Sequence, residues 1–97
     1  MRRLARDLLL GLAREIDDAR AEAALLREAL ATGRAERDDR SLRLLIAETP
    51  QAEHEAHLAA ERVNGLERRL AEVEATLAAL TAQAGHLREA FLERSGA

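Results

Sequence analysis

Two long runs of mainly hydrophobic residues at alternating three- and four-residue spacing, one on each side of Pro50, constrain this chain more than any other feature. Such spacing is typical of coiled-coil helices, in which one apolar stripe per helix packs against a partner helix. We call these positions the seam. The first run comprises Ala5, Leu9, Leu12, Ile16, Ala19, Ala23, Leu26, Leu30, Gly33, Arg37, Arg40, Leu44 and Ala47. The second comprises Ala52, Ala56, Ala59, Val63, Leu66, Leu70, Val73, Leu77, Leu80, Ala84, Leu87 and Phe91.

The amino-acid composition also favours long helices over a compact domain. The chain has 97 residues with one Phe, no Trp and no Tyr, so the side chains that usually fill a globular core are nearly missing. Ala, Leu, Glu and Arg, the strongest helix formers, dominate instead. All 15 basic residues are Arg, a bias typical of GC-rich bacterial genomes. The sequence therefore predicts an all-α protein.

Thr49-Pro50 marks the boundary between the two helices. Pro fits the first position of a helix after a Thr cap, and it disfavours helical geometry in the residue before it. Ser95-Gly96 ends the second helix. We expect one domain over 1–97, with a first helix over about 4–48, a turn at 48–50 and a second helix over about 50–94.

The two seams match each other when the chain folds back as an antiparallel α-hairpin. Residues whose numbers sum to 96 then face each other, and large side chains face small ones in several layers. The pairs include Leu9 with Leu87, Leu12 with Ala84, Ile16 with Leu80, Ala23 with Val73, Leu30 with Leu66, and Gly33 with Val63. The predicted fold is an antiparallel α-hairpin coiled coil.

Charged residues beside the seam agree with this orientation. With Leu9 and Ala56 taken as heptad position a, one edge places Arg20, Arg27 and Arg34 against Glu53, Glu67 and Glu74 at e positions, and the other pairs Glu36 with Arg62 and Arg43 with Glu55. A parallel homodimer would also have complementary edges. It would stack Arg37 on Arg37, whereas the hairpin lays Arg37 over Ala59 with its stem turned outward.

Residues 32–41 are the weak part of the first helix, because they offer no large apolar side chain. Two arrangements remain open there. Either the first helix continues through this stretch, or an exposed loop divides it into helices 4–32 and 42–48.

Two groups of residues outside the seam are candidate protein-contact sites. The first is Leu42, Leu45 and Ile46, which share an outer face just before the turn and which we call the tip cluster. The second, called the alanine stripe, follows the back of the second helix and comprises Ala71, Ala75, Ala78 and Ala82. Small residues allow another helix to approach closely, so two hairpins could pair into a four-helix bundle.

Other function classes find little support in the residues. The net charge is −3 with both signs interleaved, so no general attraction to nucleic acid is expected. There is no cysteine. His54 and His57, with Glu53 and Glu61, have metal-ligand spacing, but they lie in the first turns of a solvated helix, where no convergent set of donors held in place is expected. No apolar run approaches the roughly 20 residues of a membrane span. We expect a cytoplasmic protein that is not an enzyme and that has no metal, cofactor, small-molecule substrate, nucleic-acid or membrane partner.

Two stretches resemble known families. Arg14-Glu15-Ile16-Asp17, with Asp38 and Arg40 further on, resembles the first helix and loop of the all-helical chorismate mutases, which implies arginines that hold a dicarboxylate; the lysine of that family is missing. The run from Glu55 to Glu61, continuing through Glu67, Arg69, Glu72 and Glu74, is similar to the second helix of the Gre-type transcription cleavage factors. That resemblance implies a hairpin tip that enters RNA polymerase and binds metal through acidic residues. Glu48 and Glu53 are the acids near this tip, while Thr49 and Ala52 stand where the family has its carboxylates.

The residues taken together favour a binding function. Every recognised feature serves helix pairing, and no nucleophile and base are placed for catalysis. We therefore expect a coiled-coil scaffold, adaptor or assembly subunit that contacts a protein partner or further copies of itself as a dimer or tetramer of hairpins.

Overall fold

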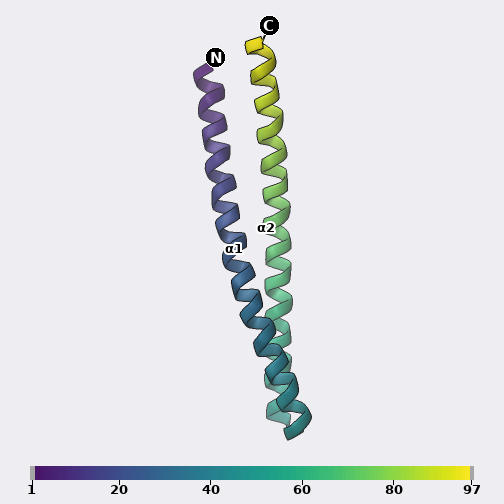
Figure 1. Ribbon diagram of the computed structural model, residues 1–97. Coiled ribbons are helices and arrows are strands. Elements are labelled where there is room, and N and C mark those ends of the chain that lie inside the picture. The colour runs from purple at the N-terminus through teal and green to yellow at the C-terminus, as the bar shows by residue number, and fades with distance from the viewer. Residues whose placement is uncertain (1, 97) are drawn as a thin grey trace. The chain divides into compact units, whose positions relative to one another are not determined.

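The chain is an all-α helical hairpin. The computed structural model describes residues 2–96, with side chains over 3–94. It consists of helix α1, Arg2–Ala47, and helix α2, Pro50–Gly96 (Figure 1). The fold class predicted from the seam is therefore confirmed.

Helix α1 runs without a break through residues 32–41, so the three-helix alternative is wrong. Two features explain this continuity. Arg37 and Arg40 are half-buried and contribute their aliphatic stems to the seam where apolar residues are missing. Gly33 is buried and closely packed, because a Cβ atom built on it would lie 3.5 Å from both Leu66 Cδ1 and Val63 Cγ2.

The turn between the helices consists of Glu48 and Thr49 alone. Glu48 has a φ of 50°, the left-handed conformation that ends many helices. Its backbone N–H donates a 3.0 Å hydrogen bond to the carbonyl oxygen of Leu44, which satisfies one of the free carbonyls at the end of α1. Glycine is the usual residue in this position, so the glutamate adopts it at a steric cost.

Thr49 begins α2 as its N-cap. The Thr49 hydroxyl oxygen accepts a 3.1 Å hydrogen bond from the backbone N–H of Ala52, and the Thr49 carbonyl accepts one of 3.0 Å from Glu53. Pro50, the first helical residue, has no N–H to satisfy. The sequence Thr-Pro thus starts α2 at the predicted boundary.

The hydrophobic core lies entirely along the predicted seam. The buried apolar residues are Ile16, Ala19, Ala23, Leu30, Ala59, Val63 and Val73. Val63 is fully buried, and no polar or charged residue is buried among the described side chains. The remaining seam leucines are half-buried, as expected when two helices cover only one face of each other.

The residues group into two compact units. The turn unit, residues 24–71, holds the two-residue turn and a core that includes Leu30 and Val63. The terminal unit comprises the described residues 2–23 and 72–96, with Ile16, Ala23 and Val73 in its core.

Candidate protein-interaction surfaces

The tip cluster is the most exposed group of large apolar side chains in the described part of the chain. Leu42, Leu45 and Ile46 lie in the last two turns of α1 and are 59%, 75% and 79% exposed. Their spacing places them on the face of α1 that points away from the seam. The exposure expected from the sequence is thus present in the structure.

Among the other exposed leucines of the described residues, only Leu4 and Leu8 lie one helical turn apart, at 65% and 52% exposed, and they lack a third exposed large apolar neighbour on that turn. All nine large apolar residues that lie outside the predicted seam are exposed, and the six beyond the tip cluster are Leu4, Leu8, Leu10, Leu25, Leu58 and Leu92. Leu25 is 66% exposed, close to the tip residues, yet it has no exposed large apolar neighbour one turn away. Isolated leucines of this kind are ordinary on protein surfaces, whereas a cluster indicates a contact site.

A shallow cleft adjoins the tip cluster. It has a volume of about 310 Å³, with Ile46, Ala47 and Ala52 as apolar lining and the charged side chains of Arg43 and Glu55 at its rim. Glu55 also lines a second cleft of about 220 Å³, which Leu58 and Arg62 border further along α2. The two clefts follow one edge of the turn unit, so exposed Ile46 and Leu58 flank the same surface.

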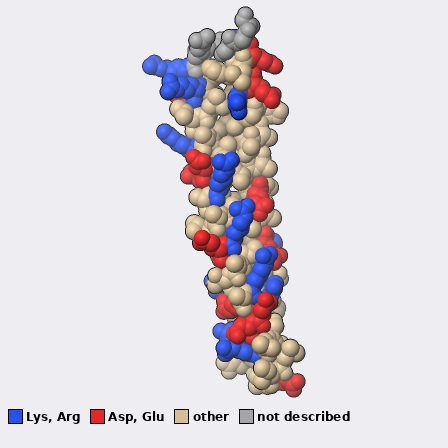
Figure 2. Space-filling view, in the orientation of Figure 1, with Lys and Arg blue, Asp and Glu red and all other residues tan. Residues whose placement is uncertain are grey.

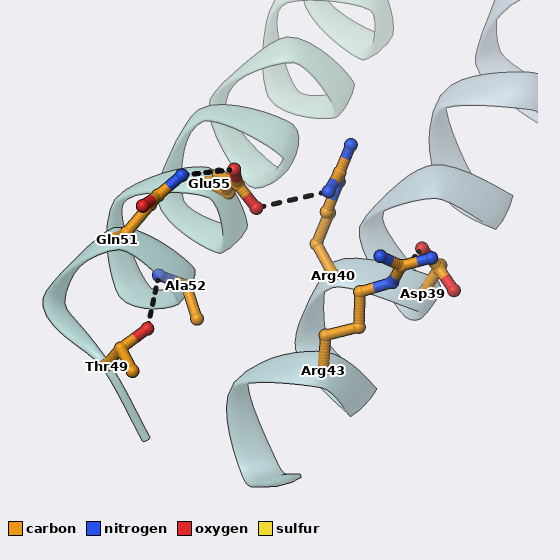
Figure 3. Close-up of polar contacts among 7 residues, drawn as sticks. All are labelled: Asp39, Arg40, Arg43, Thr49, Gln51, Ala52 and Glu55. Carbon is orange, nitrogen blue, oxygen red and sulfur yellow. Dashed lines mark hydrogen bonds and ion pairs between the residues drawn. The ribbon is translucent and has the colours of Figure 1, made fainter. Parts of the chain in front are cut away.

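Ion pairs organise the charges along this edge (Figure 3). Arg40 Nη1 lies 3.1 Å from Glu55 Oε2, and Gln51 Nε2 donates to the other oxygen of Glu55 at 3.5 Å. Arg43 Nε lies 3.0 Å from Asp39 Oδ2, one turn back on its own helix. The predicted pairing of Arg43 with Glu55 is therefore wrong, because the half-buried Arg40 reaches that carboxylate from the seam.

Two other charge pairs across the helices occur as the sequence predicts. Glu36 Oε2 and Arg62 Nη1 are 4.0 Å apart on this same edge. Arg34 Nη2 and Glu67 Oε1 are 3.8 Å apart on the opposite edge, where the e positions of the two helices meet. These exposed pairs contribute at most about 1 kcal/mol each, so they fix which helix edges adjoin more than they stabilise the fold.

The alanine stripe is exposed along the back of α2. Ala71 belongs to the turn unit, and Ala75, Ala78 and Ala82 belong to the terminal unit. Their side chains add little apolar area. The stripe therefore differs from the tip cluster, whose large side chains leave far more apolar surface in contact with water.

A larger cleft in the terminal unit was not expected from the sequence. It measures about 670 Å³ and is lined by Leu9, Leu10, Ala13 and Phe91, with Arg3 and Arg6 beside them. Leu9 and Phe91 are seam residues that remain half-buried. The sequence contains one signal for this cleft. In the hairpin register Phe91 faces the small Ala5, which leaves space beside the ring, and Leu10 lies outside the seam close to that position.

The residues considered for chemistry are dispersed over the surface. His57 Nε2 lies 3.2 Å from Glu61 Oε1 on the same helix, and no group of three or more His, Asp or Glu side chains able to hold a metal ion occurs among the described residues. Glu48 and Glu53, the acids near the tip, are both exposed. Arg14 is exposed in the terminal unit, and Asp38 contacts the neighbouring Arg37.

No protein-family model matches the chain, and neither a curated protein nor a solved structure is similar to it at a significant level. Neither described helix combines the length and the apolar character that a membrane crossing requires. The exposed surfaces of the hairpin are therefore what points to a function.

Proposed function

We propose that the protein is a non-enzymatic coiled-coil adaptor or scaffold, and that the tip cluster is the site at which it contacts a protein partner. One observation carries this proposal: the two most exposed large apolar side chains of the described residues, Leu45 and Ile46, are sequence neighbours beside the turn. Burying such a side chain contributes about 1.5–3 kcal/mol, which the free hairpin forgoes at both positions.

The surroundings of the cluster suit a helical or extended protein segment. The adjoining clefts are shallow, so they would not enclose a small molecule as ligand pockets do. Arg43 and Glu55 line the first cleft, and Arg62 and Glu55 line the second. Charges of both signs around an apolar centre are typical of protein interfaces. The partner expected here presents an apolar face with a mixed polar border.

Site-specific photocrosslinking in the source cells tests this proposal. A photoreactive residue placed at Leu45 is compared with one placed at Leu25, which has similar exposure and lies outside the cluster. We expect a discrete protein adduct from position 45 alone, and we expect Ile46→Glu to abolish it. Equal labelling at both positions would overturn the proposal.

Helical circular dichroism provides the folding control. Replacing Leu45 and Ile46 by Glu leaves the seam untouched, so the helical signal should remain while partner contact is lost. Partner contact that survives in this double variant would also contradict the assignment of the tip cluster.

A further inference from the structure

We propose that one edge of the terminal unit binds a second copy of this chain in an antiparallel, two-fold symmetric arrangement, and so forms a four-helix assembly. The edge is the one formed by the e positions and the neighbouring b positions of both helices. It lies outside the tip cluster, and the proposal does not depend on the function assigned there.

The cleft of the terminal unit lies on this edge. Leu10 and Ala13 occupy b and e positions of α1, and they line the cleft together with the seam residues Leu9 and Phe91. Seam side chains that border a cleft of about 670 Å³ are incompletely covered by the other helix. An added helix on this edge would complete their burial.

Charge is ordered along the edge in three zones. The zone nearest the chain ends holds Arg3, Arg6, Arg88 and Leu92. The middle zone holds Leu10, Ala13, Thr81 and Gly85, and the far zone holds Asp17, Arg20, Glu74 and Ala78. The space-filling view shows blue side chains at one margin and red ones at the other near the chain ends, then mainly tan surface, and then red side chains beside blue (Figure 2).

A two-fold axis through the uncharged zone brings unlike charges together. The basic zone of one copy then meets the far zone of the other, so that Arg6 faces Asp17 of the second copy. Arg3 lies at the level of Arg20 and, on the neighbouring helix, Glu74, so the Arg6–Asp17 contact is the one that selects this arrangement. Such complementarity selects both the partner and its orientation. A parallel arrangement would place the basic zones of the two copies against each other.

The middle zone provides matching shapes. Leu10 is 49% exposed and is the large side chain of this zone, whereas Ala13, Thr81 and Gly85 are small. A Cβ atom built on Gly85 meets nothing within 4 Å, so the space outside it is open. In the two-fold arrangement each Leu10 packs over the small residues of the other copy, as helix packing favours.

The opposite edge of the terminal unit is unsuited to self-pairing. Its g and c positions carry the carboxylates of Glu15, Asp18 and Glu93 and no arginine, beside the exposed Leu4 and Leu8. Two copies joined there would bring carboxylates together. The contrast between the edges assigns the second copy to the e-position edge.

The exposed area leaves room for such an interface. The chain exposes 7473 Å², and a compact monomer of this length would expose about 2000 Å² less. A standard protein interface removes about 800 Å² from each partner. The excess exposed area of the hairpin is therefore larger than the area that each copy would bury in a dimer.

Charge reversal combined with light scattering tests the proposal on the full chain. The wild type should have the mass of two chains, and Leu10→Glu should have the mass of one. Arg6→Glu and Asp17→Arg should each weaken the dimer about tenfold or more, because like charges then meet. The double variant Arg6→Glu/Asp17→Arg should restore the dimer, since the swapped charges attract again across the two-fold axis.

Matched controls make each outcome decisive. Asp18→Arg reverses the neighbouring charge on the opposite edge and should leave the mass unchanged, and Leu45→Glu/Ile46→Glu should do so too. All variants should keep the helical signal, because the substituted residues are exposed. A wild-type mass of one chain, growth beyond two chains, failure of the double variant to recover, or loss of the dimer in either control would each overturn the proposal.

Discussion

The guanidinium of Arg40 lies 3.1 Å from the carboxylate of Glu55, so an ion pair joins α1 to α2 from a position that the seam pattern reserves for an apolar side chain. Both side chains are partly exposed, at 32% and 40%. This pair connects the seam to the charged edge of the turn unit, where Arg43 pairs with Asp39 on its own helix.

Replacing Arg40 by Leu should raise the free energy of unfolding by about 1 kcal/mol, because an apolar side chain at the seam gains more than a partly exposed ion pair provides. Urea denaturation measures this change. Arg43→Leu is the matched control, since its ion pair stays within one exposed helix, and it should alter stability by less than about 0.5 kcal/mol. A loss of stability in Arg40→Leu would mean that the ion pair contributes more than exposed pairs usually do.

Gly33→Ala should stabilise the hairpin by about 1 kcal/mol, because alanine is the better helix former and the new methyl group fits. Its Cβ would lie at ordinary contact distance, 3.5 Å, from Val63 and Leu66. Gly65→Ala is the control that gains helix propensity with no atom within 4 Å. Thermal unfolding should show Gly33→Ala at least as stable as Gly65→Ala, and Gly33→Leu less stable than the wild type. A Gly33→Ala variant less stable than Gly65→Ala would show that the seam cannot accept a methyl group at position 33.

Glu48→Gly should stabilise the turn by about 1 kcal/mol, because glycine adopts a φ of 50° without the steric conflict that a Cβ atom causes. Denaturant unfolding followed by circular dichroism is the measurement. Glu48→Ala retains the Cβ atom and should show no comparable gain. Equal stabilisation by both substitutions would point to the loss of the carboxylate charge and not to backbone geometry.

The seam was predictable because many residues specify it together. Every buried residue of the described chain, from Ile16 in the terminal unit to Val63 in the turn unit, belongs to the predicted seam, and Thr49-Pro50 marks the start of α2 correctly. A shift of register would expose all of these side chains at once, so the free-energy difference between registers is large. Patterns of this kind are readable in one sequence.

Individual surface contacts were less predictable because single small energies decide them. Arg40 and Arg43 both lie on the edge that carries Glu55. The free energies of the two alternative ion pairs with Glu55 differ by only about a fraction of a kcal/mol. The terminal-unit cleft depends on how far Leu9 and Phe91 stay uncovered, which the spacing of residues does not encode. The roles of the tip cluster and the alanine stripe stay predictions.

The two-residue turn also determines the order in which the helices can pair. With only Glu48 and Thr49 between them, the first contacts close a very short loop, and each later contact is brought within reach by the one before it. Leu9 and Phe91 come together last and separate first, so backbone amides near the chain ends should exchange with solvent fastest. A second copy docked on that end would therefore slow hydrogen exchange most where the isolated hairpin protects its amides least.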